Sequence, residues 1–198
     1  IDLLPRHVTG AVVAIEDRRF YEHSGVDPAG IVRAIFANLR AGRFAQGGST
    51  LTQQLAKNLF LTSERKISRK IEELALALWL ELRLSKDAIL ELYLNRVYFG
   101  AGAYGVDAAA RKYFGRSARD VSIFEAAMLA GMLKAPSRYN PFNDKDLARA
   151  RARLVIASMV AAGQLSEEEA QAISEASAPS VAAGTKSQIG QYFADWVI

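Results

Sequence analysis

The sequence lacks cysteine altogether, and only two of its 198 residues are histidine. The absence of cysteine excludes disulfide scaffolds, thiolate zinc sites and cysteine nucleophiles. The two histidines, His7 and His23, do not have the spacing of metal ligands. No apolar run approaches the ~20 residues that a membrane-spanning helix needs; the longest runs cover residues 74–80 and 126–133. Patterns typical of β-strands are also scarce.

The composition that remains is that of an ordinary globular domain. Hydrophobic residues make up 51% of the chain and charged residues 23%, which excludes global disorder. The length predicts one domain, or one domain with an added lobe. The net charge of +4 favours an anionic partner, such as a nucleic acid, a lipid headgroup or a phosphorylated ligand. The chain begins at Ile1 without a signal-peptide pattern, so we expect it to be part of a longer protein.

Helix signals dominate, and they predict an all-α domain. Apolar residues at helical spacing follow Pro5, and this helix would bring Glu16, Phe20 and His23 onto one side if it continued that far. Capping boxes predict helices that begin near residues 50, 122 and 166. Further helices are expected at residues 29–39, 64–84, 85–95 and 144–162. Residues 177–186 are typical of a linker, which divides the chain into a domain at 1–176 and, at 177–198, a linker and the start of a following domain.

Two groups of residues have the chemistry of a functional site. The first is the pair Glu16–Asp17, which lies at the end of an apolar helix just before Phe20 and His23. A carboxylate that aromatic neighbours shield from water has a raised pKa and can serve as a base near neutral pH. The alternative is a solvated acidic pair at a helix end, flanked by two arginines.

The second group is a basic run that ends in two glutamates. It comprises Lys57, Arg65, Lys66, Arg69 and Lys70. A helix face with several cations and one carboxylate suits a diphosphate. Gly47 and Gly48, which precede this run, lead into a helix N-terminus, where free N–H groups favour anions. The segment lacks the P-loop spacing, so a nucleoside triphosphate is not implied. The alternative is a solvent-exposed face of ion pairs.

Together these segments resemble the motifs of the peptidoglycan glycosyltransferases, the family-51 transferases of bacterial cell-wall synthesis. The matching segments are, in the family's order, 16–25 (EDRRFYEHSG), 48–58 (GSTLTQQLAKN), 69–73 (RKIEE), 86–95 (KDAILELYLN) and, more loosely, 151–156 (RARLVI). In the last, Ala152 stands where a second arginine is usual. The resemblance covers about residues 1–165 and implies a lysozyme-like, two-lobed helical fold with a small, membrane-facing jaw lobe.

The resemblance also implies roles for individual residues. Glu16 would be the general base that takes the proton from the 4-hydroxyl of the acceptor, lipid II, so that a β-1,4 link forms with inversion and a polyprenyl diphosphate leaves. Glu73 would assist this departure or hold a divalent cation, Mg or Mn, beside the diphosphate; the sequence requires no other cofactor. The diphosphate site would comprise Ser49, Gln53, Lys57, Arg65 and Lys70. The cleft would be shaped by Asp17, Phe20, His23, Thr50, Gln54 and Asn58.

The implied partners are lipid II with the growing glycan, the membrane surface and a transpeptidase domain in the parent chain; no nucleic acid is expected. The implied location is the extracytoplasmic face of the bacterial plasma membrane. Residues 29–39 would form an apolar interfacial patch, with Arg33 and Arg40 near anionic headgroups, unless this segment packs into the core instead. Residues 191–197 resemble the junction of bifunctional class A penicillin-binding proteins.

Two other functions stay open at the level of sequence. A lysozyme-like hydrolase or lytic transglycosylase would share the fold and the catalytic glutamate but would have no use for the cations at positions 57, 65 and 70. A non-enzymatic basic module for nucleic acid or membrane would bind any polyanion with a steep dependence on salt. Its binding of polyanions would also not change when Glu16 is replaced by Gln.

Overall fold

The computed structural model describes residues 3–42, 47–60 and 67–176, and nearly all of its regular structure is helical. The elements are α1 (Arg6–Glu16), α2 (Pro28–Ala41), α3 (Leu51–Phe60), α4 (Ile67–Arg83), α5 (Lys86–Arg96), β1 (Tyr98–Gly100), β2 (Ala103–Tyr104), α6 (Val106–Phe114), α7 (Ile123–Met132), α8 (Lys145–Ala161) and α9 (Glu167–Ala176). The prediction of an all-α domain is confirmed, with one short antiparallel hairpin inserted. The expected linker and start of a following domain, at 177–198, lie outside the described residues.

The predicted capping boxes begin three of these helices. Before α3, the Gln53 N–H donates to Thr50 Oγ1 over 3.2 Å, and the Thr50 N–H donates to Gln53 Oε1 over 3.2 Å. Before α7, Ser122 and Glu125 exchange the same pair of bonds. Before α9, Ser166 and Glu169 also exchange this pair of bonds. Each box satisfies N–H groups that a helix start leaves without partners, which is why short sequence patterns locate these helix starts.

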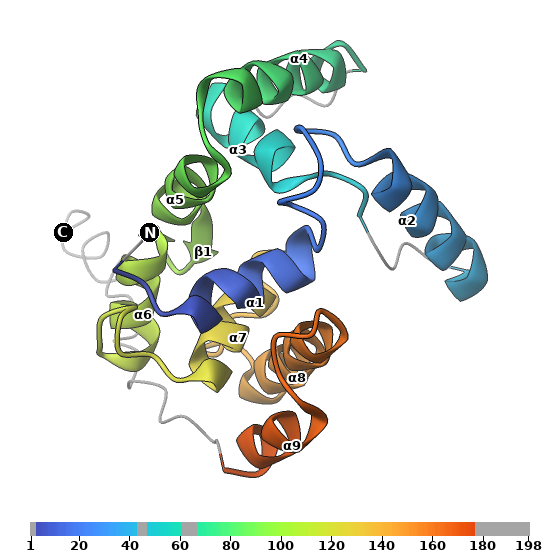
Figure 1. Cartoon of the computed structure of the whole chain (residues 1–198). Helices are drawn as coiled ribbons and strands as arrows, with labels where there is room; N and C mark the ends of the chain where they lie inside the picture. Colours follow the sequence, from blue (N-terminus) through green and yellow to red (C-terminus); the bar gives the residue numbers. More distant parts are fainter. Residues whose placement is uncertain (1–2, 43–46, 61–66, 177–198) are drawn as a thin grey trace, which may run out of the picture.

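The core is built around α7, a helix that is buried on nearly every side. It packs against α1 and α8, whereas α3 packs against α4 and α5 (Figure 1). A helix that is apolar all round belongs in the interior. Leu51 and Leu55 on α3 are fully buried and join the same core as Val8 and Val12 on α1. One continuous core therefore fixes the end of α1 relative to α3 and α4.

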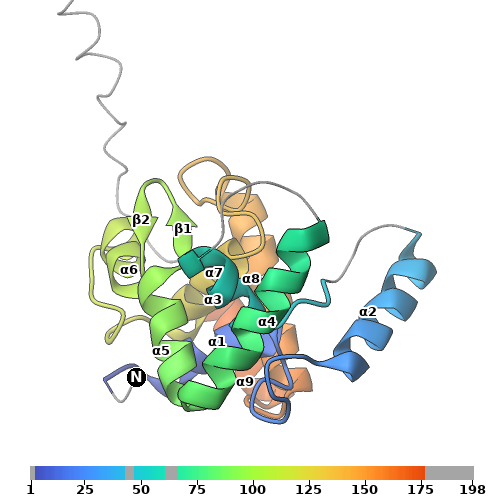
Figure 2. The same ribbon diagram turned by 90° about the horizontal axis from the view of Figure 1, so that it is seen from above.

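Helix α2 stands away from this body, as Figures 1 and 2 show from two directions. Its apolar side chains are exposed to solvent, and those with the largest exposed fractions are Phe36 at 68% and Leu39 at 72%. The alternative that this segment packs into the core is therefore wrong. The separate α2 agrees with the predicted small lobe. None of the helices in the described residues is both long and apolar enough to span a membrane.

Helix α1 ends at Glu16, and turns replace it over residues 17–25. Glu16, Phe20 and His23 consequently do not share one helix face. Between α5 and α6, a glycine-rich segment forms a hairpin. Its Gly100 has φ +92°, and an added Cβ would come within 2.9 Å of the Pro136 carbonyl oxygen, so this position requires glycine.

Candidate active site

A cleft of about 920 Å³ brings most of the predicted site residues together. Its walls come from the end of α1, from α2, from the start of α3, from α4, and from α8 with the segment after α7. Eight predicted residues line it: Glu16, Asp17, Ser49, Thr50, Gln54, Lys57, Lys70 and Glu73. The carboxylate at the end of α1 and the cations of α3 and α4 therefore face the same space, as the sequence predicts.

Glu16 is the last residue of α1, and its side chain is half-buried. Its Oε2 accepts a hydrogen bond of 2.9 Å from the side-chain amide of Gln54 on α3. Burial raises the pKa of Glu16 above its ordinary value, against the opposing effects of the Gln54 bond and of the positive charges on Arg151 and Lys134. A carboxylate with a raised pKa binds a proton more readily near neutral pH, which suits a general base.

Asp17 ties the end of α1 to the start of α3. Its buried carboxylate lies 2.9 and 3.0 Å from Nε2 of His23, and it accepts the Leu51 N–H over 2.9 Å. The Gly25 N–H donates to Nδ1 of the same imidazole, so Nε2 is the nitrogen whose proton faces Asp17. An anion at a helix N-terminus is stabilising. Because Glu16 directly precedes Asp17 in the chain, these bonds also fix the position of Glu16.

The cations of the cleft surround a second, buried carboxylate. Lys70 Nζ donates to Ser49 Oγ over 3.0 Å and also to Glu73 Oε1, which lies closer still. Arg69 places a guanidinium nitrogen 4.0 Å from Glu73 Oε2. In the described part of the chain, Nε and one terminal nitrogen of Arg69 are buried without a hydrogen-bond partner. Buried donors of this kind normally have partners; among the described residues the charge partner of this guanidinium is Glu73, so Arg69 adds a fixed positive charge to the wall of the cleft.

Several predicted residues lie outside the lining of the cleft. Gln53 is buried and uses its side chain in the cap of α3, while Asn58 is exposed. Phe20 is fully buried in the core, with Lys86 Nζ 4.5 Å from its ring centre. His23 lies behind Asp17 and supports it. Arg65 and its neighbour at position 66 lie outside the described residues.

Six further charged residues line the cleft beyond the predicted site; of these, the sequence analysis placed Arg69 in the basic run and Arg33 beside the apolar interfacial patch. The six are Arg18, Asp27, Arg33, Arg69, Lys134 and Arg151. Arg69 has a local signal, because it lies one helical turn before Glu73 in the basic run. Lys134 has no such signal and Arg151 has only that of the loosely matching segment 151–156; the packing of α7 and α8 against α1 brings both to the cleft. Among the described residues that line the cleft, seven are cationic and four acidic, so the cleft favours an anionic ligand.

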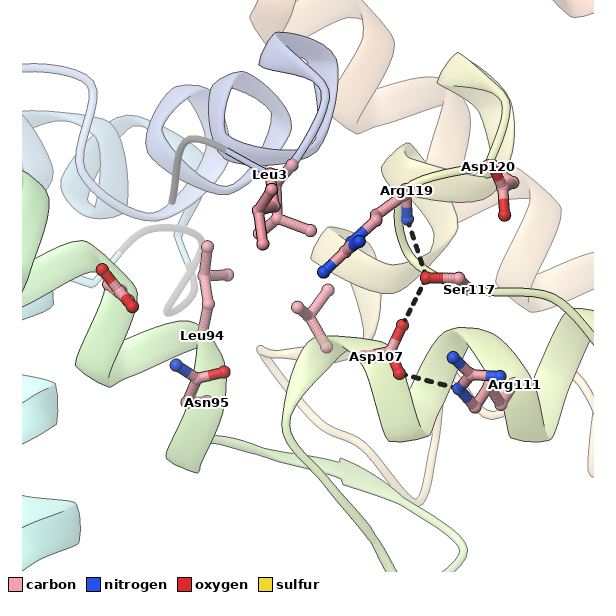
Figure 3. Close-up of a pocket in the computed structure, with 11 residues that line it drawn as sticks. Leu3, Leu94, Asn95, Asp107, Arg111, Ser117, Arg119 and Asp120 are labelled. Atoms are coloured by element: carbon pink, nitrogen blue, oxygen red, sulfur yellow. Dashed lines mark hydrogen bonds and ion pairs between the residues drawn. The ribbon is translucent and has the colours of Figure 1, made fainter.

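A second cavity, of about 710 Å³, lies at the opposite end of α1 from Glu16 and is shown in Figure 3. Its central carboxylate, Asp107, accepts bonds from the side chains of Arg111 and Ser117 and from the Ala118 N–H. These bonds, led by that of Arg111, lower the pKa of Asp107 to about 2. The carboxylate is thus fully engaged and stays ionised at neutral pH. None of the predicted site residues lines this cavity, so the first cleft is the candidate active site.

Comparisons with known proteins show the family to which the chain is related. A family model described as Transglycosylase matches residues 1–160. Penicillin-binding protein 1A of Aquifex aeolicus is 53% identical over 85% of this chain and 23% of that protein. Penicillin-binding protein 1A of Escherichia coli is 48% identical over 85% of this chain and 20% of that protein. A putative transglycosylase of Cupriavidus necator is 47% identical over 85% of this chain and 73% of that protein.

Among solved structures, the crystal structure of penicillin-binding protein 1A from Haemophilus influenzae aligns with 64% of this chain and 16% of that chain. The sequence identity there is 27% and the TM-score 0.42. The chain spans about a fifth of the length of the penicillin-binding proteins named above. It spans nearly three quarters of the shorter transglycosylase.

Proposed function

Because the chain belongs to the transglycosylase family, we propose that it polymerises lipid II into the β-1,4-linked glycan strands of peptidoglycan. One structural observation carries the proposal beyond family membership. The half-buried carboxylate of Glu16 and the cationic group formed by Lys57, Arg69 and Lys70 line the same cleft. One group can accept a proton while the other receives a diphosphate, and glycosyl transfer from a lipid diphosphate needs both.

Glu16 acts on the acceptor. The 4-hydroxyl of a sugar is a poor nucleophile, so its proton must be removed as the oxygen attacks. The proton moves to the carboxylate of Glu16. The 4-hydroxyl oxygen of the acceptor forms a bond to the anomeric carbon of the growing glycan, and the configuration at that carbon inverts. Burial raises the pKa of Glu16, whereas Lys134 and Arg151 lower it. The net effect is a raised pKa, which makes this carboxylate a stronger base than an ordinary glutamate.

The cations of α3 and α4 act on the leaving group. A polyprenyl diphosphate leaves with the bonding electron pair and needs neutralisation of charge more than protonation. The guanidinium of Arg69 and the ammonium groups of Lys57 and Lys70 supply this charge. Arginine binds phosphate through a planar fork and lysine as a point charge. Glu73 is buried between Arg69 and Lys70 and holds both cations in position.

We assign no step of this reaction to a metal ion. Within the described ranges, histidine, aspartate and glutamate side chains do not gather in any group of three or more that could hold one. Glu73, the predicted ligand, is already paired with Lys70 and Arg69. A divalent cation at this place would therefore be bound chiefly by the oxygens of the diphosphate itself.

The exposed apolar face of α2 supports a location at the membrane, where the lipid tails of the substrate lie. This face comprises Ile31, Val32, Ile35, Phe36 and Leu39. We propose that it enters the interface of the bacterial plasma membrane on the extracytoplasmic side, with Arg33 and Arg40 close to anionic headgroups. We further propose that the parent chain carries a transpeptidase domain, because the similar penicillin-binding proteins are several times longer than this chain.

The decisive experiment supplies the protein with labelled lipid II and, separately, with purified sacculi. The proposal predicts glycan polymer from lipid II and no soluble fragments from sacculi. Release of muropeptides from sacculi without polymer from lipid II would instead establish a hydrolytic or lytic enzyme. Binding of unrelated polyanions with equal affinity, and no reaction with either substrate, would establish a non-enzymatic module.

Arg69→Ala tests the diphosphate site within this function. Charge-assisted bonds contribute about 1.5–3 kcal/mol each, so we expect inhibition by inorganic diphosphate to weaken about 10- to 100-fold. The KM for lipid II should rise in parallel. Arg111→Ala is the matched control, because Arg111 is an exposed arginine paired with Asp107 outside the cleft. Equal effects of the two substitutions would contradict the placement of the diphosphate.

A further inference from the structure

Behind Glu16, two hydrogen bonds connect three helices in a line. Tyr93 on α5 is fully buried, and its hydroxyl donates to Oε1 of Gln54 over 2.9 Å. The amide nitrogen of Gln54 on α3 then donates to Oε2 of Glu16 at the end of α1 over 2.9 Å. Tyr93 lies outside the lining of the cleft, and its hydrogen-bonded connection to Glu16 runs through the Gln54 amide.

The chemistry of the amide gives this line a direction. A glutamine side chain has a donor end and an acceptor end, which differ little in shape and exchange when the amide rotates by half a turn. Burial, and after it the charge of Glu16, raise the pKa of Tyr93 well above its ordinary range, so the phenol keeps its proton. When this proton is donated to Oε1, the amide nitrogen must face Glu16. The opposite orientation would place the amide oxygen against the carboxylate.

We propose that Tyr93 is a positioning residue for glycosyl transfer: its hydroxyl fixes the amide of Gln54, and the amide holds Oε2 of the base, Glu16. The bond occupies one lone pair of Oε2, so Oε1 is the less engaged oxygen and the one we assign to the proton of the acceptor hydroxyl. This inference rests on the function proposed above, in which Glu16 is the base. It assigns Tyr93 a role that neither its burial nor its aromatic character reveals.

Tyr93→Phe removes the hydroxyl and keeps the ring in the core. The Gln54 amide is then free to rotate, and Glu16 loses a donor that lowers its pKa. The other groups that act on Glu16 are unchanged: Arg151 on α8, Lys134 after α7, and the adjacent Asp17. We therefore expect the acid limb of the rate profile to move to higher pH. We also expect kcat at neutral pH to fall about 5- to 10-fold, as for the loss of one hydrogen bond, with little change in KM.

Tyr113→Phe is the matched control. Tyr113 is equally buried, and its hydroxyl donates to the Phe99 carbonyl over 3.0 Å beside the hairpin, away from the cleft. Polymerisation of lipid II is measured from pH 5 to pH 9 for the wild type and both variants, together with their thermal unfolding. The inference predicts a shifted acid limb for Tyr93→Phe alone. Equal losses of kcat in both variants without a shift would show a structural role for Tyr93 and overturn it.

A second variant shows whether Tyr93 acts through Gln54. Gln54→Leu removes the bond to Glu16 while Tyr93 stays in place, so it must move the acid limb whether or not Tyr93→Phe folds. When the two substitutions are combined, Tyr93→Phe must add no further shift, because the amide is already gone. An additional shift, or an unmoved limb in Gln54→Leu, overturns the inference. A wild type that makes no polymer contradicts the proposed function instead, and a Tyr93→Phe enzyme with the wild-type profile contradicts only the positioning role.

Discussion

Replacing Glu16 by Gln tests the catalytic base and the burial of its charge with one substitution. The glutamine keeps the size of the side chain and an oxygen that can accept from Gln54, but it cannot take up a proton. General bases contribute about 10²- to 10⁴-fold to a rate. We therefore expect polymerisation of lipid II to fall at least about 100-fold, while lipid II still binds, because the cations of α3 and α4 are untouched.

The same substitution should stabilise the fold, and the effect should depend on pH. Burial raises the pKa of Glu16 above the ordinary value of 4.5. At a pH between the ordinary pKa of the unfolded chain and the raised pKa of the folded protein, the folded protein binds a proton that the unfolded chain has lost. The free energy of unfolding therefore falls as the pH rises through this window and stays lower above it. Each unit by which a pKa is raised costs about 1.4 kcal/mol. An uncharged glutamine avoids this cost.

The assay compares thermal unfolding of the variant and the wild type at pH 4 and at pH 8. In a domain of this size, about 1 kcal/mol moves the midpoint by about 2–4 °C. We expect the variant to unfold a few degrees higher than the wild type at pH 8 and at nearly the same temperature at pH 4. A variant that unfolds at a lower temperature at pH 8, or that retains more than about a tenth of the wild-type rate, would refute this account of Glu16.

Two further predictions concern parts of the chain outside the cleft. Ser122→Ala removes the side chain that caps α7, so it should lower the free energy of unfolding by about 1 kcal/mol without changing the polymerisation rate. Thermal unfolding measures the first effect and the lipid II assay the second. A changed rate would show that α7 is coupled to the cleft. Phe36→Ser combined with Leu39→Ser should weaken sedimentation with anionic lipid vesicles and leave the unfolding midpoint unchanged, because both side chains are exposed. Unchanged vesicle binding would contradict the proposed membrane contact.

The parts of the fold that sequence reasoning predicts are those with local causes. Helix starts at Thr50 and Ser122 depend on side chains three residues apart, and the structure contains these bonds. The same holds for Lys70 and Glu73, which one turn of α4 places together. The end of α1 depends only in part on local chemistry. The turn after Glu16 is held by the bond that the Leu51 N–H of α3 donates to Asp17, and no pattern within residues 16–25 contains this contact.

The residues that sequence reasoning could not place depend on packing between distant elements. Lys134 and Arg151 reach Glu16 only because α7 and α8 pack against α1, more than 100 residues along the chain. Gln53 and Gln54 show a finer limit. They are neighbours in sequence, yet the first folds back to cap α3 and the second reaches Glu16. Their different roles follow from their positions in the first turn of the helix, which differ by about 100° around its axis.

Helix α3 connects the two halves of the proposed chemistry. Leu51 and Leu55 lie fully buried in the core, while Thr50, Gln54 and Lys57 line the cleft. Both sets follow the 3.6-residue period of a single helix, so the packing that fixes the leucines also fixes the directions of the amide and the ammonium group. The Leu51 N–H is in addition bonded to the Asp17 carboxylate beside the base. The distance between proton acceptor and cations is therefore set by the core of the domain and does not depend on flexible surface side chains alone.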